Sequence, residues 1–203
     1  MESIESAALA RNDRYLREFV EALDLCPFAR KCRETGRLAR RVLRGSHPTE
    51  ATLAAVTELE RTSEDQVEVA LLIFPEFDGG VSVFGEFRDE VRAAVRLFYC
   101  VAFHPDLPMD LSDANRAVSF LRRSPDPTLQ LVRIATLERV RSGRPAGTFY
   151  LDMSRISPAD VNALHRSVSV SDQIAEANLR TLRDQSPAAL EGLLASLRST
   201  IAD

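Results

Sequence analysis

The order of apolar and polar positions predicts helices and strands that alternate along the chain. Residues 13–25 place apolar side chains at close to a helical period, and Pro27 ends that helix. A second helix over residues 27–35 can begin at this proline, because proline is tolerated at the first helical position. The run 38–43 predicts a short strand, and Thr49 predicts the start of the next helix.

The middle of the chain carries the clearest strand patterns. Residues 67–74 form an apolar run closed by Pro75, which is typical of a buried central strand. Residues 84–97 have helical spacing. The apolar run 98–103 then predicts a second buried strand, which ends directly before His104. A helix is therefore expected to connect these two strands.

The second half of the chain is predicted to be irregular at first and helical later. Residues 105–128 hold four prolines and indicate a long connection, which a small helix over residues 113–121 interrupts. The segments expected next are a strand at 129–134, a helix at 135–142 and a short strand at 148–151. From residue 157 onward, two Ser-Pro steps predict helix starts, so we expect the chain to end in helices.

Strands that alternate with helices and then give way to helices alone predict an α/β or α+β fold, with a layered sheet, flanking helices and a C-terminal helical tail. A ferredoxin-like arrangement of the β-α-β-β-α-β type is the main alternative. We divide the chain into a core domain over residues 1–156 and C-terminal helices packed on the core over residues 157–203. A chain of 203 residues is long enough for one well-buried core.

Composition and charge narrow the class of protein. Apolar residues make up 45% of the chain and charged residues 28%, as in ordinary folded domains. A net charge of −4 argues against a surface that binds nucleic acid. The sequence shows no long apolar run, so we expect no secretory signal and no membrane span. Its three cysteines have no repeated spacing, which fits a reducing compartment and predicts a cytoplasmic protein.

Three reactive or hydrogen-bonding side chains each stand directly before a proline: Cys26, His104 and Ser124. Proline favours an extended backbone at the residue before it, so each of these residues lies at a junction. Cys26 would cap the helix over residues 27–35, where unpaired N–H groups stabilise a thiolate. His104 would lie at the carboxyl end of a buried strand, where open α/β sheets bind ligands.

Arginines around Ser124 add a cationic component. A guanidinium presents a planar set of donors that fits a carboxylate or a phosphate. We expect Arg123 and Arg133 to bind an anion together with the Ser124 hydroxyl, and Arg122 to be solvated. Alternatively, at least one of these arginines pairs with a carboxylate of the same connection, such as Asp126.

The other cysteines and histidines fit structural roles better. We expect Cys32 and Cys100 to be buried in a helix and a strand, and His47 and His165 to face solvent. Asn178 is expected to be a buried hydrogen-bonding residue rather than a catalytic one. The chain contains no zinc, Walker or dinucleotide-binding motif, so we expect no structural metal.

The segments around the X-Pro steps resemble an uncharacterised bacterial family, domain of unknown function 1415. The matching segments are 25–29, 102–106 and 123–127, with Leu131 and Arg133 behind the last and a weaker match at Ile174, Asn178 and Leu182. The family has no established activity. The resemblance therefore implies no particular reaction. Because it covers all three X-Pro steps, we expect them to converge on one pocket, with Arg123 and Arg133 as further members.

The chain also departs from this family pattern. Arg122 and Asp126 stand where the family has asparagine and tyrosine, and Gln130 and Ile134 stand where it has histidine and glutamate. Residues 144–170 look like an insertion.

These residues together predict a small cytoplasmic enzyme that binds an anionic small molecule. Cys26 would be the thiolate nucleophile or redox group, His104 its proton partner, and the arginines would hold the substrate. The first alternative is a haem-binding protein or haem-dependent enzyme with Cys26 or His104 as axial ligand. The second is a non-catalytic interaction protein, in which the X-Pro steps only shape the core. The substrate, the reaction class and the oligomeric state stay open.

Overall fold

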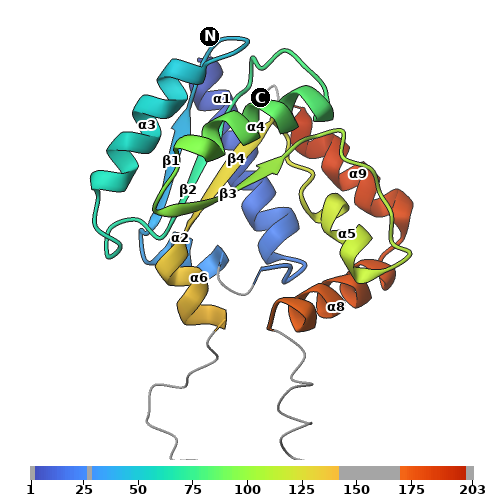
Figure 1. Ribbon diagram of the computed structural model, residues 1–203. Helices are drawn as coiled ribbons and strands as arrows, with labels where there is room; N and C mark the ends of the chain where they lie inside the picture. The colour runs from blue at the N-terminus through green and yellow to red at the C-terminus, as the bar shows by residue number, and fades with distance from the viewer. Residues whose placement is uncertain (1–2, 27–28, 142–169, 200–203) are drawn as a thin grey trace, which may run out of the picture.

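The computed structural model describes residues 3–26, 29–141 and 170–199 (Figure 1). Within these ranges, four strands form one mixed sheet with helices on both faces and a helical tail. The predicted fold class is confirmed. The predicted strand at 148–151, the boundary between residues 156 and 157, and His165 all lie outside the described residues.

Helices precede the sheet. They are α1 (Ile4–Arg14), the π-helix η1 (Tyr15–Glu21) and α2 (Ala29–Glu34). Ser3 caps α1, because its side chain accepts a hydrogen bond from the N–H of Ser6. η1 follows α1 directly, so the predicted helix over residues 13–25 is the second part of a longer one. Gly36 lies just past α2 with a φ of +70°, a conformation that favours glycine.

The rest of the described chain alternates strands and helices as the sequence predicts. The elements are β1 (Leu38–Val42), α3 (Thr49–Arg61), β2 (Val69–Ile73), α4 (Val81–Ala94), β3 (Phe98–Phe103), α5 (Ala114–Leu121), β4 (Thr128–Arg133), α6 (Ile134–Arg141), α8 (Val170–Arg183) and α9 (Pro187–Arg198). Local signals explain two of the starts. The side chain of Asp113 caps α5, and Pro187 occupies the first turn of α9.

The sheet has the strand order β1-β2-β4-β3. β1 and β2 are parallel, and β4 is antiparallel to both of its neighbours, β2 and β3. A helix separates every two successive strands, so the chain order differs from the ferredoxin-like alternative. β3 lies at an edge of the sheet, and the ring of Tyr99 in its middle is 44% exposed.

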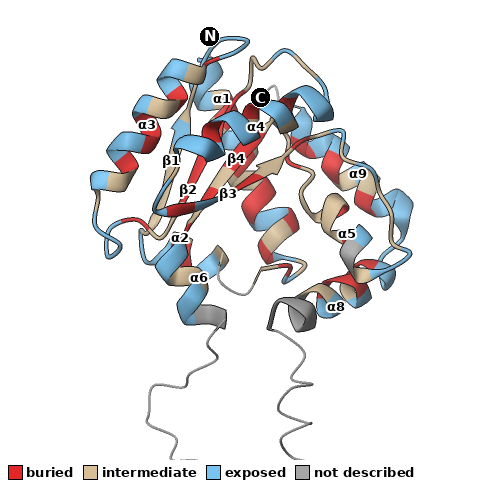
Figure 2. Cartoon of the chain, viewed as in Figure 1, coloured by how far each residue is buried: buried red, intermediate tan, exposed pale blue. Residues whose placement is uncertain are grey.

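Each face of the sheet carries its own hydrophobic cluster. Buried residues lie on the strands and on the helices that cover them (Figure 2). Side chains alternate between the faces, so Ala70 and Leu72 of β2 pack toward α3 and α4, whereas Leu71 and Ile73 pack toward the opposite cluster. That second cluster includes residues of α1, η1, α5, α8 and α9. Both clusters use the central strand β2, which explains why its sequence is apolar throughout.

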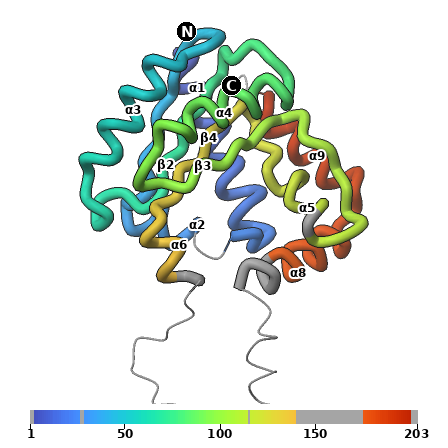
Figure 3. Tube along the Cα trace, in the orientation of Figure 1, coloured from blue at the N-terminus to red at the C-terminus, as the bar shows by residue number. Residues whose placement is uncertain are grey.

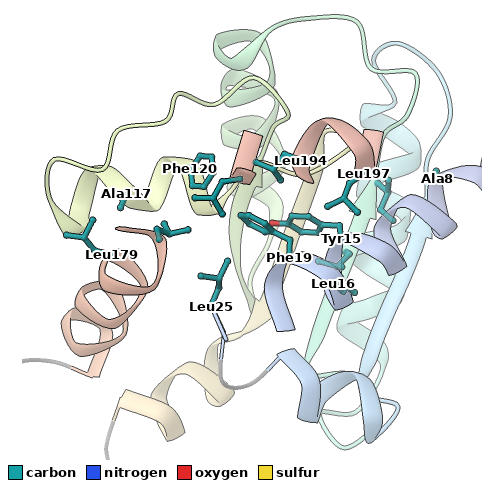
Figure 4. Packing of buried hydrophobic residues seen from close by; sticks show 14 residues of the cluster. Ala8, Tyr15, Leu16, Phe19, Leu25, Ala117, Phe120, Leu179, Leu194 and Leu197 are labelled. Atoms are coloured by element: carbon teal, nitrogen blue, oxygen red, sulfur yellow. The ribbon is translucent and has the colours of Figure 1, made fainter. Parts of the chain in front are cut away.

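Aromatic and leucine side chains join the two ends of the chain in the second cluster (Figure 4). The rings of Tyr15 and Phe19 stack at 5.6 Å, and Phe120 of α5 meets the Phe19 ring edge-on at 6.0 Å. Leu194 and Leu197 of α9 belong to the same cluster, and α9 contacts both α1 and η1 (Figure 3). Of the described helices, none is both long and apolar enough to cross a membrane.

Candidate functional site

A pocket of about 350 Å³ lies on the face of the sheet covered by η1, α5 and α8. We call it the Cys26 pocket. Most of its wall is apolar, with leucine, valine and phenylalanine side chains from the helices and the sheet. Its polar lining residues include Asn12, Tyr15, Cys26, Arg122, Ser124 and Asn178. An apolar pocket with a few convergent polar groups is the usual form of a small-molecule site.

The alternation of β4 explains how the sheet contributes polar groups to this pocket. Leu129 and Leu131 belong to the cluster under α3 and α4, so Thr128 and Gln130 face the other way and line the pocket.

Cys26 is partly exposed and lies between η1 and α2. Its carbonyl accepts a hydrogen bond of 3.2 Å from the N–H of Ala29, the first residue of α2. Leu25 before it is held by Asn178, whose side-chain amide donates to the Leu25 carbonyl at 3.0 Å. Asn178 is 6% exposed, so its prediction as a buried hydrogen-bonding residue is confirmed. The tail helix thus fixes one side of the cysteine.

Tyr15 begins the π-helix η1 and lines the pocket. Its hydroxyl donates a hydrogen bond of 3.2 Å to the carbonyl of Leu121 at the end of α5. Burial raises the pKa of Tyr15 well above its usual range, and the nearby Cys26 raises it further. Tyr15 therefore stays neutral at ordinary pH and acts as a hydrogen-bond donor. π-Helical turns are frequent at functional sites.

Arg122 also lines the pocket, and here the structure differs from the expectation that it is solvated. Arg122 is half-buried, and this burial lowers the pKa of its guanidinium. Among the residues that the structure describes, no carboxylate, carbonyl or hydroxyl forms an ion pair or hydrogen bond with this guanidinium. It is a partly desolvated cation without a bonded partner in the described chain.

Ser124 and Thr128 contribute hydroxyls whose protons are already used. Both donate to the carbonyl of Asp126, Ser124 at 2.5 Å and Thr128 at 2.9 Å. What remains on each oxygen is the capacity to accept. The Asp126 carboxylate pairs with Arg11 at 2.9 Å, so the expected ion pair of this connection forms with an arginine of α1.

Asn12 of α1 is a deeply buried polar residue of the pocket wall, at 3% exposure. No group in residues 3–26, 29–141 or 170–199 hydrogen-bonds to its side-chain oxygen, Oδ1. A buried acceptor without a donor is costly, so this atom calls for an explanation.

His104 lies outside the pocket, on the face of the sheet covered by α4. Its ring packs against Phe84 at 5.8 Å and is 4% exposed. Nδ1 accepts a hydrogen bond from the N–H of Asp106 at 3.1 Å, which leaves the proton on Nε2, 3.3 Å from the carbonyl of Gly79. Both ring nitrogens are therefore engaged by backbone groups in this arrangement.

Arg133 lies at the opposite end of the sheet from His104. In the ladder, Arg133 stands opposite Phe98 at the start of β3, whereas His104 follows the end of β3. Its guanidinium donates to the carbonyls of Val67, Leu59 and Thr62 and lies 4.7 Å from the Phe98 ring. All of these partners belong to the protein, so the guanidinium of Arg133 has a structural role in the fold.

Arg123 likewise bonds to protein groups. Its Nε donates to the carbonyl of Pro105 at 3.1 Å, and its Nη1 pairs with the carboxylate of Glu191 in α9. Of the side chains predicted to form the site, the structure brings Cys26 and Ser124 together in one pocket. It places His104, Arg123 and Arg133 elsewhere.

Sequence reasoning missed Asn12, Tyr15 and Arg122. One signal was present for Asn12, which lies on the same helical face as Ala8 and Tyr15, so it is a polar side chain in an apolar stripe. No comparable signal distinguishes Arg122 from Arg123, because the turn after α5 decides which of the two faces the pocket.

The remaining cysteines and histidines behave as predicted where they are described. Cys32 and Cys100 are buried, and desolvation raises the pKa of each thiol to about 11. His47 is exposed. Searching the described residues for clusters of three or more His, Cys, Asp or Glu side chains that could hold a metal ion finds none. A second hollow, of about 430 Å³, is lined by exposed residues around Glu64 and Arg139.

Comparison with known families gives one match. The family described as "Protein of unknown function (DUF1415)" matches residues 7–148. No curated protein and no solved structure matches the chain. Most polar residues of the pocket wall lie inside the matched range, whereas Asn178 comes from the tail beyond it. The pocket therefore combines the family segment with the C-terminal helices.

Proposed function

The chain belongs to the DUF1415 family of proteins of unknown function, and from its pocket we propose that it is an enzyme that binds a small anionic molecule at Arg122 and Cys26. The observation that carries the proposal is the half-buried Arg122 guanidinium without a bonded partner among the described residues. Cations removed from water are ordinarily paired, since an unpaired one costs free energy. A carboxylate or phosphate of a ligand would supply the missing partner.

The neighbouring arginines support this assignment by contrast. Arg11 pairs with Asp126, Arg123 with Glu191, and Arg133 with three backbone carbonyls. Their fixed partners leave Arg122 as the guanidinium of the Cys26 pocket best suited to an incoming anion.

Cys26 is the reactive group of the proposed enzyme. A thiolate is the strongest nucleophile that the described wall of the pocket can supply. The described lining residues include no histidine and no carboxylate. Arg122 lines the same pocket, and its positive charge would attract the anionic ligand toward Cys26.

The test compares two alkylating reagents of similar size, iodoacetate, which is anionic, and iodoacetamide, which is neutral. The rate of each at Cys26 is measured by peptide mass spectrometry in the folded protein and in the chain unfolded in urea. We expect the ratio of the iodoacetate rate to the iodoacetamide rate to be higher in the folded protein. Arg122→Gln should lower the folded ratio by about fivefold, which corresponds to a charge interaction of about 1 kcal/mol.

A matched variant removes an arginine elsewhere. Arg61 is exposed at the end of α3, on the other side of the sheet, and Arg61→Gln should leave the ratio unchanged. If folding does not raise the ratio, or if both variants lower it equally, no local anion site exists at Cys26 and the proposal is wrong.

A further inference from the structure

The Cys26 pocket also contains acceptor atoms that an anionic group cannot satisfy. Resting on the proposed function, we infer that the bound molecule carries a neutral hydrogen-bond donor, a hydroxyl, in addition to its anionic group and an apolar body. The proposed ligand class is therefore a small hydroxy acid. Three independent features of the pocket wall lead to this class.

The first feature is Asn12. Its side chain is 3% exposed and lines the pocket, and within the described chain Oδ1 has no hydrogen-bond partner. Oδ1 can only accept, so a carboxylate or a phosphate oxygen in contact with it would be repelled. A ligand O–H or N–H satisfies this atom, and the gain is large because leaving a buried acceptor unpaired is costly.

The second feature is the state of the neighbouring hydroxyls. Ser124 and Thr128 both line the pocket, and the hydroxyl of each donates its hydrogen bond to the carbonyl of Asp126. Their oxygens can accept a hydrogen bond but have no proton left to donate in this arrangement. The polar wall therefore has accepting oxygens on Asn12, Ser124 and Thr128 and a donating cation, Arg122, beside the amide donors of Asn12 and Gln130.

The third feature decides between a hydroxyl and an ammonium group as the donor. No Asp or Glu belongs to the described lining of the pocket, and the nearby Asp126 carboxylate is neutralised by Arg11. A buried ammonium without a counter-charge is far more costly than a buried hydroxyl with an acceptor. The accepting oxygens of the wall thus favour a neutral donor. Leu16, Val20 and Leu71 line the same pocket and suit an apolar body.

The test uses probes that share one branched apolar body. They are 4-methylpentanoate, its 2-hydroxy and 3-hydroxy derivatives, and leucine. Each is titrated against wild-type protein while iodoacetamide alkylates Cys26, and the readout is the concentration that halves the alkylation rate. We expect one of the hydroxy acids to halve the alkylation rate of Cys26 at a concentration about fivefold lower than the unsubstituted acid does. This is the gain in affinity expected from one additional hydrogen bond. Leucine should protect no better than 4-methylpentanoate.

Two variants at one position assign the effect. Asn12→Leu keeps the size of the side chain and removes the acceptor, so the advantage of the hydroxy acid should disappear while the unsubstituted acid still protects. Asn12→Asp places a carboxylate at the same position, so leucine should become the better protector. Each variant reports on a preference among probes rather than on binding alone, and a general loss of stability would not produce opposite preferences.

The outcomes separate this inference from the function on which it rests. Equal protection by all three acids, or a hydroxyl advantage that survives in Asn12→Leu, overturns the hydroxyl assignment and leaves the anion site intact. A preference for leucine in the wild-type protein overturns the neutral donor. If none of the probes protects, the hydroxy-acid class is wrong, and the iodoacetate ratio decides the proposed function independently.

Discussion

The side-chain amide of Asn178 in α8 donates a 3.0 Å hydrogen bond to the backbone oxygen of Leu25, the residue directly before Cys26. Both residues are buried, and Leu25 packs in the same cluster as Leu179 (Figure 4). We predict that Asn178→Ala lowers the free energy of unfolding by about 1–3 kcal/mol, because it leaves the Leu25 carbonyl without its donor. Iodoacetamide should also alkylate Cys26 faster, because the segment that holds the thiol is released.

Glu176 provides the control for this variant. It lies on the same helix and is exposed, so Glu176→Ala should change the free energy of unfolding in urea by less than about 0.5 kcal/mol. It should leave the alkylation rate unchanged. If Asn178→Ala and Glu176→Ala had equal effects, the loss of stability would come from changed helix propensity in α8. The hydrogen bond to Leu25 would then have no role in placing Cys26.

Arg133 is predicted to be a stability residue. Arg133→Met keeps the length of the apolar stem but removes the guanidinium donors of the Val67 and Thr62 carbonyls, whereas the Leu59 carbonyl keeps its bonds from Thr62. We expect the free energy of unfolding in urea to fall by about 3 kcal/mol, as for two buried acceptors left unpaired.

The comparison variant is Arg96→Met, because Arg96 is exposed just before β3, and it should have little effect. The ratio of iodoacetate to iodoacetamide rates at Cys26 should be the same in both folded variants. A lower ratio in Arg133→Met alone would instead return Arg133 to the anion site that the sequence suggested.

Local signals explain why most elements were predictable from the sequence. The apolar run of β2, the capping side chain of Asp113 and the proline at the start of α9 act over a few positions, so their effect can be read directly from the sequence. α1 was missed because its apolar residues are mostly small, and it is stabilised by the burial of Ala8 against distant parts of the chain. The edge position of β3 depends on pairing with β4, which no local pattern encodes.

The candidate site was predictable only in part, for a related reason. The structure places Cys26 and Ser124, two of the residues at X-Pro steps, in the lining of one pocket. The X-Pro step at His104 instead lies on the other face of the sheet. Side chains alternate between the faces along β3, and this alternation continues for one residue past the end of the strand. Residue type likewise cannot show that Arg123 and Arg133 have protein partners, since those partners come from α9 and from the segment before β2.

The three cysteines should differ sharply in reactivity. Burial raises the pKa of the Cys32 and Cys100 thiols to about 11, and both are shielded from solvent, whereas Cys26 is partly exposed. We predict that a disulfide reagent at pH 8 modifies Cys26 alone in the folded protein, and all of the cysteines after unfolding in urea. Cys26→Ser should abolish the fast modification, whereas Cys32→Ser should not. Fast labelling of Cys32 or Cys100 would show that α2 or β3 opens readily.

Glu21 should make the stability of the fold depend on acid pH. Its carboxylate is buried at the end of η1 and accepts hydrogen bonds from Arg33 at 2.7 and 2.9 Å. These bonds, with the positive charge of Arg33 and Arg30, hold the pKa of Glu21 below its ordinary value of 4.5. Because the folded pKa is lowered, the stabilisation is fully present above the unfolded value and is lost as pH falls through the folded one.

Glu21→Gln should therefore unfold at a lower urea concentration than the wild type at pH 7, and the difference between the two should shrink as the pH falls below 4.5. Glu34→Gln is the control. Glu34 is exposed and its carboxylate lies 3.8 Å from the same Arg33, which makes a weak ion pair, so this substitution should shift the urea midpoint little at any pH. Urea midpoints measured from pH 7 down to the acid limit of the fold decide the matter. A constant difference between wild type and Glu21→Gln across this range would mean that the Glu21 carboxylate and its ion pair with Arg33 do not contribute to the acid sensitivity.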